Sequence, residues 1–136
     1  MKKMTKFEKL GLDQKLLDTL DDAGFTTPFP IQERTIPILL EGSDVIGQAH
    51  TGTGKTAAYA LPMLQLITAK QGIQGIIMAP TRELAIQITA EVNRFAVKTG
   101  IVRSCIGNGV INPASSSVSS SFFSNPKFSN FVIFFI

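Results

Sequence analysis

The sequence has 136 residues, 44% of them hydrophobic, and a net charge of +3 from 13 Lys and Arg against 10 Asp and Glu. This length accommodates one ordinary domain, able to bury about two-thirds of its unfolded surface. The modest positive excess permits a nucleic-acid partner without requiring one. The single cysteine, Cys105, excludes an internal disulfide, and we assign it no chemistry. No apolar stretch of signal-peptide length follows the N-terminus, so we expect a cytoplasmic protein without a membrane segment.

Two helices are predicted in the first part of the chain. Asp13 is a suitable N-cap for a helix whose leucines share one face, and Gly24 is a suitable left-handed terminus. A second helix is predicted to begin at Pro30 and to end at Gly42. Pro37 should kink it, because proline removes a backbone donor.

From residue 45 the pattern alternates between strand and helix. Strands are predicted over Val45 to Gln48, 75–79 and 101–106, and helices over 55–69 and 82–97. Strands that alternate with helices indicate a parallel sheet. The predicted fold class is therefore α/β, with a parallel sheet flanked by helices.

The run from Ala49 to Thr56, AHTGTGKT, lies between a predicted strand and a predicted helix, the context that a phosphate-binding loop requires. Gly52 and Gly54 allow backbone conformations that are closed to residues with a Cβ, so successive N–H groups can turn toward phosphate oxygens. Lys55 can reach the terminal phosphates, and the Thr56 hydroxyl can bind Mg²⁺. A structural Gly/Thr-rich turn is the alternative, but it has no need of Gly-Lys-Thr behind a strand. We predict a nucleotide-phosphate site.

Three segments together resemble the DEAD-box RNA helicase family. The runs 24–32 (GFTTPFPIQ), 49–56 and 80–85 (PTRELA) look like its Q motif, motif I and motif Ia, in the family's order and at suitable spacing. Phe7 fits the isolated aromatic residue that the family places upstream of its Q motif. The resemblance covers residues 1–106 and implies an incomplete RecA-like P-loop domain that uses ATP and Mg²⁺ and contacts the RNA backbone.

The resemblance implies roles for single residues around adenine. Gln32 would contact the adenine edge, since its amide has a donor and an acceptor for N6 and N7, and this geometry favours ATP over GTP. Phe7 would pack on the base, whereas Phe25 would anchor the turn after the first helix. An exposed helical glutamine and core phenylalanines are the alternative interpretations. Phe29 stands where the family usually has Thr.

The resemblance also places nucleotide contacts along the whole loop and catalytic roles at its last two residues. His50 is expected to be a bystander. The predicted nucleotide contacts are Phe7, Gln32, Ala49, Thr51, Gly52, Thr53, Gly54, Lys55 and Thr56, of which Lys55 and Thr56 are the predicted catalytic residues and Thr56 is the predicted metal ligand.

Pro80, Thr81 and Arg82 resemble the part of motif Ia that the family uses at the RNA backbone. Thr81 is a suitable N-cap for the helix that follows. Arg82 would oppose the dipole of that helix, so an anion is expected to come to meet it. An RNA phosphate and an internal carboxylate are the two candidates, and we favour the phosphate.

The composition changes abruptly at residue 107. Residues 107–136 have no acidic residue, one basic residue, eight serines and six of the ten phenylalanines. They form either a flexible linker to a last buried strand or sequence outside the fold, for instance from a shifted reading frame, and we favour the second. The 136 residues contain neither the Asp-Glu-Ala-Asp motif of the family nor its second RecA-like domain. The resemblance therefore implies a fragment that binds ATP but does not hydrolyse it by itself.

Three functions from different classes stay open. The first is an ATP-binding helicase fragment with a partial RNA site, and the second is a non-catalytic interaction module or an inert fragment. The third is an unrelated P-loop enzyme, such as a small kinase. The lack of a second carboxylate motif after the loop disfavours this third function. The sequence makes no prediction of the oligomeric state.

Overall fold

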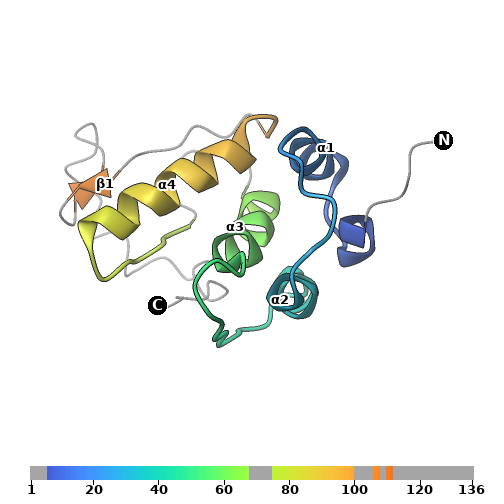
Figure 1. Ribbon diagram of the computed structural model, residues 1–136, viewed down its shortest axis with the longest axis horizontal. Coiled ribbons are helices and arrows are strands. Elements are labelled where there is room, and N and C mark those ends of the chain that lie inside the picture. Colours follow the sequence, from blue (N-terminus) through green and yellow to red (C-terminus); the bar gives the residue numbers. More distant parts are fainter. Residues whose placement is uncertain (1–5, 68–74, 100–105, 108–109, 112–136) are drawn as a thin grey trace.

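The computed structural model describes residues 6–67, 75–99, 106–107 and 110–111. Figure 1 shows helices that dominate the described residues and a small pair of strands near the start of the last helix. The elements are a 3-10 helix η1 (Lys6–Leu10), the α-helices α1 (Gln14–Asp22), α2 (Pro30–Leu40), α3 (Lys55–Leu66) and α4 (Arg82–Ala96), and the strands β1 (Ile106–Gly107) and β2 (Val110–Ile111). No described helix has the length and apolar character needed to cross a bilayer.

All four predicted α-helices are confirmed, and local signals set their ends. Asp13 caps α1, because its side-chain Oδ1 accepts a hydrogen bond of 3.1 Å from the Leu16 N–H. Gly24 follows α1 and Gly42 follows α2, with φ values of 79° and 86° in the left-handed region. Helix α2 continues through Pro37 to Leu40. The short helix η1 was not predicted.

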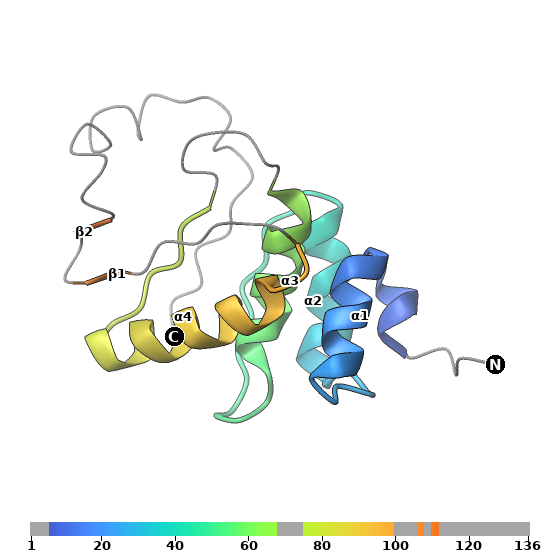
Figure 2. The same cartoon turned by 90° about the horizontal axis from the view of Figure 1, so that it is seen from above.

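The helices pack around one core with α3 at its centre. Figures 1 and 2 show α3 between α2 and α4, while α1 packs on α4 and η1 packs on α2. Residues 57–62 of α3 are buried without interruption, as expected for a helix that is apolar on all sides. The core side chains are Phe7, Leu10, Leu12, Leu16, Leu20, Ile36, Ala57, Tyr59, Ala60, Leu61, Leu64, Ile88, Phe95 and Ala96.

Phe25 anchors the turn after α1, as the sequence predicts. Its ring meets the Phe95 ring of α4 edge to face, with centroids 5.7 Å apart and planes at 62°. The Arg94 guanidinium lies 5.4 Å from the centroid of the Phe25 ring. Arg94 also donates a hydrogen bond of 3.0 Å to the Ala23 carbonyl. These contacts attach the end of α1 to the end of α4.

The predicted parallel sheet is not confirmed. Residues 45–48 and 75–79 belong to neither a helix nor a strand. A strand is defined by backbone hydrogen bonds to a partner, and the described part of the chain gives neither segment such a ladder. The Ile46 side chain is fully exposed and Met78 is exposed. Ile77, in contrast, packs against the core.

The third predicted strand lies mostly outside the described residues. Of residues 101–106, only Ile106 is described, and it belongs to β1. This strand pairs antiparallel with β2, with Ile106 opposite Ile111, so it is not part of a parallel sheet in the described residues. Cys105 also lies outside the described residues. So does the segment 107–136, except for the backbone of Gly107 and of β2.

Candidate nucleotide-binding site

The loop at 49–54 ends at a left-handed glycine, Gly54, and α3 begins at the next residue. Gly52 and Gly54 have φ values of 79° and 73°, which confirms the predicted need for residues without a Cβ. Gly54 is the N-cap of α3, and no side chain caps the first N–H groups of this 12-residue helix. A helix N-terminus of this kind offers free donors and a positive dipole end to an anion. The backbone therefore suits a phosphate group.

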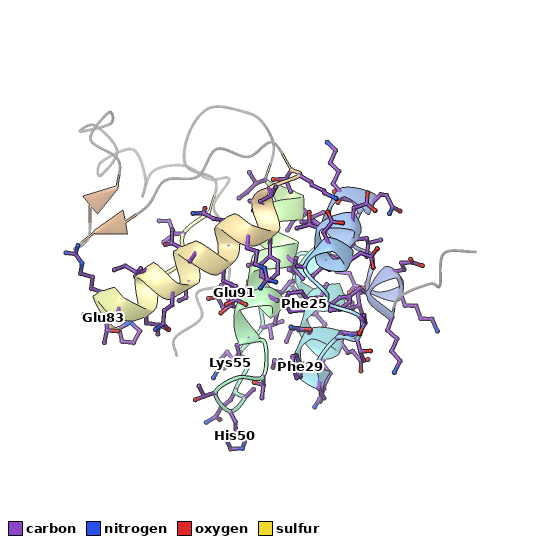
Figure 3. All side chains as sticks on the ribbon, turned by 45° about the horizontal axis from the view of Figure 1, so that its top comes forward. Phe25, Phe29, His50, Lys55, Glu83 and Glu91 are labelled. Carbon is purple, nitrogen blue, oxygen red and sulfur yellow. The ribbon has the colours of Figure 1, made fainter. Side chains whose placement is uncertain are left out.

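Two hydrogen bonds fix the loop in a tight turn. Lys55 Nζ donates to the Ala49 carbonyl oxygen over 2.5 Å, so the side chain folds back to the start of the loop. The Thr53 hydroxyl donates to the His50 carbonyl oxygen over 2.6 Å. The His50 side chain is exposed, and Figure 3 shows it at the tip of the loop, beyond Lys55. The expectation that His50 is a bystander stays a prediction.

Gln32 connects the start of α2 to the phosphate loop. Its side chain is fully buried. Oε1 accepts a hydrogen bond of 2.9 Å from the Phe29 N–H, and Nε2 donates one of 3.0 Å to the Gly54 carbonyl oxygen. A side-chain amide keeps one more hydrogen and one more lone pair after two such bonds. Adenine would bind either to this remaining hydrogen and lone pair or in place of the bonds to Phe29 and Gly54. The role of Gln32 at the base therefore stays a prediction.

Gly54 also lies where no side chain fits. A Cβ built there would stand 2.2 Å from Gln32 Nε2 and 2.9 Å from Phe29 Cδ2. A Cβ on Gly52 would meet nothing within 4 Å. The two glycines therefore serve different needs: Gly52 supplies only the backbone conformation, whereas Gly54 also permits close approach of the loop to α2.

The structure does not present Phe7 to a ligand. Its side chain is 1% exposed and belongs to the core, which it enters from η1. Packing on a base would require this ring to leave the core, because its faces are covered by other side chains. The core-phenylalanine interpretation describes the observed position. Phe29, in contrast, is 43% exposed and lies beside Gly54.

Thr56, the predicted metal ligand, lies in the first turn of α3. Tyr59 lies one turn later in α3, and burial raises its pKa. A hydrogen bond with the Thr56 side chain lowers this pKa in part, and the nearby Glu91 carboxylate raises it further. Among the described residues, no group of three or more His, Cys, Asp or Glu side chains could hold a metal ion. Mg²⁺ commonly enters such sites with the phosphates of a nucleotide, and a hydroxyl at this position fits that mode of binding.

The predicted RNA contacts lie at the start of α4, apart from the loop at 49–54 in Figures 1 and 2. Thr81 is confirmed as the N-cap of α4, since its hydroxyl accepts a hydrogen bond of 3.2 Å from the Leu84 N–H. Pro80 and Arg82 are exposed, and Arg82 has no ion pair within 6–67 and 75–99. Figure 3 shows Glu83, the next residue, far from the loop that carries His50.

The structure thus brings some predicted site residues together and leaves others apart. Gln32 and the loop at 49–56 form one connected unit, while Phe7 is buried and 80–82 are distant in every view. Sequence reasoning missed the contact between Phe29 and Gly54. The signal available was an aromatic residue directly before the proline that begins α2.

The sequence model of the DEAD/DEAH box helicase family matches residues 29–127. An ATP-dependent RNA helicase CshA from Listeria monocytogenes is 53% identical over 94 residues, which cover 68% of this chain and 18% of that protein. A DEAD-box ATP-dependent RNA helicase CshA from Streptococcus pneumoniae is 52% identical over 108 residues, which cover 78% of this chain and 21% of that protein. This chain belongs to the DEAD-box RNA helicase family, and it spans about a fifth of the length of these relatives.

Solved structures of the family share the fold. Dbp5 from Saccharomyces cerevisiae bound to RNA and ADP BeF3 matches with a TM-score of 0.74 and 32% identity, over 97% of this chain and 32% of that one. The helicase Prp28 from Chaetomium thermophilum bound to ADP matches with a TM-score of 0.70 and 35% identity, over 99% of this chain and 32% of that one. Each match covers about a third of the solved chain.

Proposed function

We propose that this chain binds ATP at the loop 49–56 and forms the nucleotide-binding part of a DEAD-box RNA helicase. The observation that carries the proposal is the backbone of the loop, with two left-handed glycines, a lysine and a helix N-terminus without a side-chain cap. These features concentrate positive charge and free N–H donors at one point. The structures of Prp28 bound to ADP and of Dbp5 bound to RNA and ADP BeF3 support nucleotide binding.

The individual roles follow from the positions of the side chains. Lys55 would exchange its bond with the Ala49 carbonyl for the terminal phosphates, which are stronger acceptors for an ammonium group. Thr56 would bind Mg²⁺, which neutralises phosphate charge when it is bound. Gln32 would contact the adenine edge while it holds Gly54 in place.

We also propose that the start of α4 contacts the RNA backbone. Arg82 is exposed, follows the N-cap Thr81 and has no ion pair within 6–67 and 75–99. An exposed guanidinium beside a helix N-terminus suits a phosphate diester. The bound RNA in the Dbp5 structure supports this assignment at the level of the family.

Hydrolysis by these 136 residues alone is not part of the proposal. Phosphoryl transfer depends on groups that position water and neutralise developing charge. The 136 residues contain no Asp-Glu-Ala-Asp motif. The proposed activity of this stretch of chain is therefore binding of ATP with Mg²⁺, and a cytoplasmic location stays a prediction.

The arrangement of strands belongs to the same proposal. Residues 45–48, 75–79 and 101–106 would be strands of one parallel sheet in residues 1–106. Apolar side chains such as Ile46 and Met78 point into solvent from these segments, and a complete sheet with its covering layers would bury them. The likeness to solved helicases with TM-scores of 0.70 and above supports this arrangement.

A second candidate function is a non-catalytic interaction fragment. The exposure of Ile46 and Met78 favours it, because exposed apolar segments of this kind bind other chains or aggregate. Self-association without nucleotide binding would favour this function over the first.

Calorimetric titration with ATP and with GTP, each with Mg²⁺, tests the first proposal. We expect ATP to bind and GTP to bind more weakly, since the guanine edge presents an oxygen where adenine presents an amino group. Absence of binding by both nucleotides would contradict the proposal. Equal binding of the two would remove only the role assigned to Gln32.

A further inference from the structure

Tyr59 is a buried phenol one turn after Thr56, the predicted magnesium ligand. Its side chain is 6% exposed and belongs to the core. A hydrogen bond joins it to the side chain of Thr56, which is only partly buried in the first turn of α3. Glu91 of α4, the helix that packs on α3, is the acidic group near the phenol. Figure 3 shows Glu91 close to α3, above Lys55 in that view. Thr56 is thus in contact with a fixed core side chain.

The pKa of Tyr59 indicates the direction of the hydrogen bond. The bond with Thr56 lowers this pKa, so it favours the ionised phenol, which can only accept a hydrogen. Thr56 is therefore the donor and the Tyr59 oxygen is the acceptor. Burial, the largest effect, and the Glu91 carboxylate raise the same pKa and keep the phenol neutral near pH 7.

Other helical threonines direct their hydroxyls along their own helix. Thr19, Thr35 and Thr89 each donate to the carbonyl oxygen four residues earlier, over 2.9, 2.7 and 2.8 Å. The Thr56 hydroxyl donates instead to a side chain one turn later in the helix. Its hydrogen is then committed to the core, and the two lone pairs of its oxygen stay available to another partner.

A hydroxyl that binds Mg²⁺ does so through a lone pair, and its hydrogen still needs an acceptor. An acceptor on the core side turns the lone pairs toward the loop, where the phosphates and their metal would lie. We propose that Tyr59 is a positioning residue, whose oxygen accepts the Thr56 hydrogen and so orients Thr56 toward the Mg²⁺ of the bound nucleotide. This inference rests on the proposed function, since it requires a nucleotide with Mg²⁺ at the loop.

Calorimetric titration with ATP in excess Mg²⁺ and in EDTA tests the proposal. The ratio of the two affinities is the magnesium gain of a variant. We expect Tyr59→Phe, which keeps the ring and removes the hydroxyl, to lower this gain about fivefold, the equivalent of one hydrogen bond, and to leave the affinity in EDTA unchanged. Thr19→Val removes another buried hydroxyl, in α1, and should keep the full gain. An unchanged gain in Tyr59→Phe, or equal weakening in both solutions, would overturn the proposal.

A double-mutant cycle with Thr56→Ala separates positioning from a general effect on the fold. Once the Thr56 hydroxyl is absent, Tyr59→Phe should cause no further loss of the magnesium gain. Losses that add in the double variant would show that Tyr59 acts independently of Thr56, which also overturns the proposal. ATP binding by the unmodified chain without any magnesium gain would refute this inference and leave nucleotide binding intact. Absence of ATP binding in both solutions would remove the proposed function together with this inference.

Discussion

Gln32 Nε2 donates a hydrogen bond to the carbonyl oxygen of Gly54, 3.0 Å away and 22 residues later in the chain. The same side chain accepts from the Phe29 N–H. The start of α2 and the phosphate loop are therefore joined through one buried amide. A change in this link should affect both the stability of the fold and the shape of the proposed nucleotide site.

Replacing Gln32 with alanine should destabilise the chain. The substitution leaves the Phe29 N–H and the Gly54 carbonyl without their partner at a buried position, and such losses cost about 1–3 kcal/mol. Urea denaturation measures the change in the free energy of unfolding. Gln87→Ala, on an exposed face of α4, is the matched control and should change it by less than about 0.5 kcal/mol. Equal effects of the two substitutions would contradict the structural role of Gln32.

Alanine at Gly54 should be more harmful than alanine at Gly52. Both positions have positive φ, so each substitution carries a backbone strain of about 1–2 kcal/mol. Only at Gly54 does the new Cβ also collide with Gln32 and Phe29. We expect an extra loss in the free energy of unfolding of about 1–3 kcal/mol, because the buried hydrogen bond must break. Urea unfolding curves of Gly52→Ala and Gly54→Ala measure this difference in the free energy of unfolding. Equal losses in the two variants would contradict the close approach of the loop to α2.

The helices were predictable because their signals are local. Asp13 and Thr81 each cap a helix by accepting a hydrogen bond from the N–H of the residue three positions later. Gly24 needs only its own left-handed backbone conformation. The sheet could not be established in the same way, since a strand depends on partners that are distant in the sequence. Residues 45–48 show this limit. Their sequence pattern is typical of a strand, but among the described residues no neighbouring segment forms backbone hydrogen bonds with them as a strand partner.

The site was predictable at the level of the loop but not at the level of its contacts. The Gly-Lys-Thr order indicates phosphate binding through the chemistry of three adjacent residues. The burial of Phe7 and the position of Phe29 depend on how η1 and α2 pack, and a motif carries no information about that packing. The bond between Gln32 and Gly54 likewise joins residues that only the fold brings together.

Ionisation of Tyr59 should lower the free energy of unfolding at alkaline pH. Burial, more than any other cause, raises the pKa of Tyr59 above 10.0 in the folded chain. The folded state then retains a proton that the unfolded state releases, so this contribution is complete below about pH 10 and is lost as the pH rises through the folded pKa. Tyr59→Phe should remove this part of the loss. Urea unfolding from about pH 8 to 11 measures it, and tyrosinate absorbance follows the chain's only tyrosine.

Lys98, whose pKa Asp22 raises through a hydrogen bond, also loses its proton in the alkaline range. It is present in both proteins, so the difference between their stability profiles isolates Tyr59. Identical profiles for the unmodified chain and Tyr59→Phe would show that the ring ionises equally easily in the folded and unfolded states.

Arg82 and Thr81 should separate RNA binding from stability. Arg82→Ala should leave the free energy of unfolding nearly unchanged, since the exposed side chain has no ion pair within 6–67 and 75–99. It should weaken single-stranded RNA binding for all sequences and lower the salt slope by about one. Thr81→Ala should destabilise α4 by about 0.5–2 kcal/mol, and Thr81→Ser should restore the cap. RNA affinity that is insensitive to Arg82→Ala would exclude the predicted phosphate contact.

The central claim is that the loop at 49–56 binds ATP, and thermal unfolding with and without MgATP tests it most directly. ATP at 100 times its Kd should stabilise the unmodified chain by about 2.7 kcal/mol, and Lys55→Ala should lose most of this gain. Lys9→Ala, an exposed change in η1, should keep it. A nucleotide-dependent shift in the unmodified chain and in Lys9→Ala, but not in Lys55→Ala, is the predicted result. No shift in the unmodified chain, or an equal shift in Lys55→Ala, would contradict the claim.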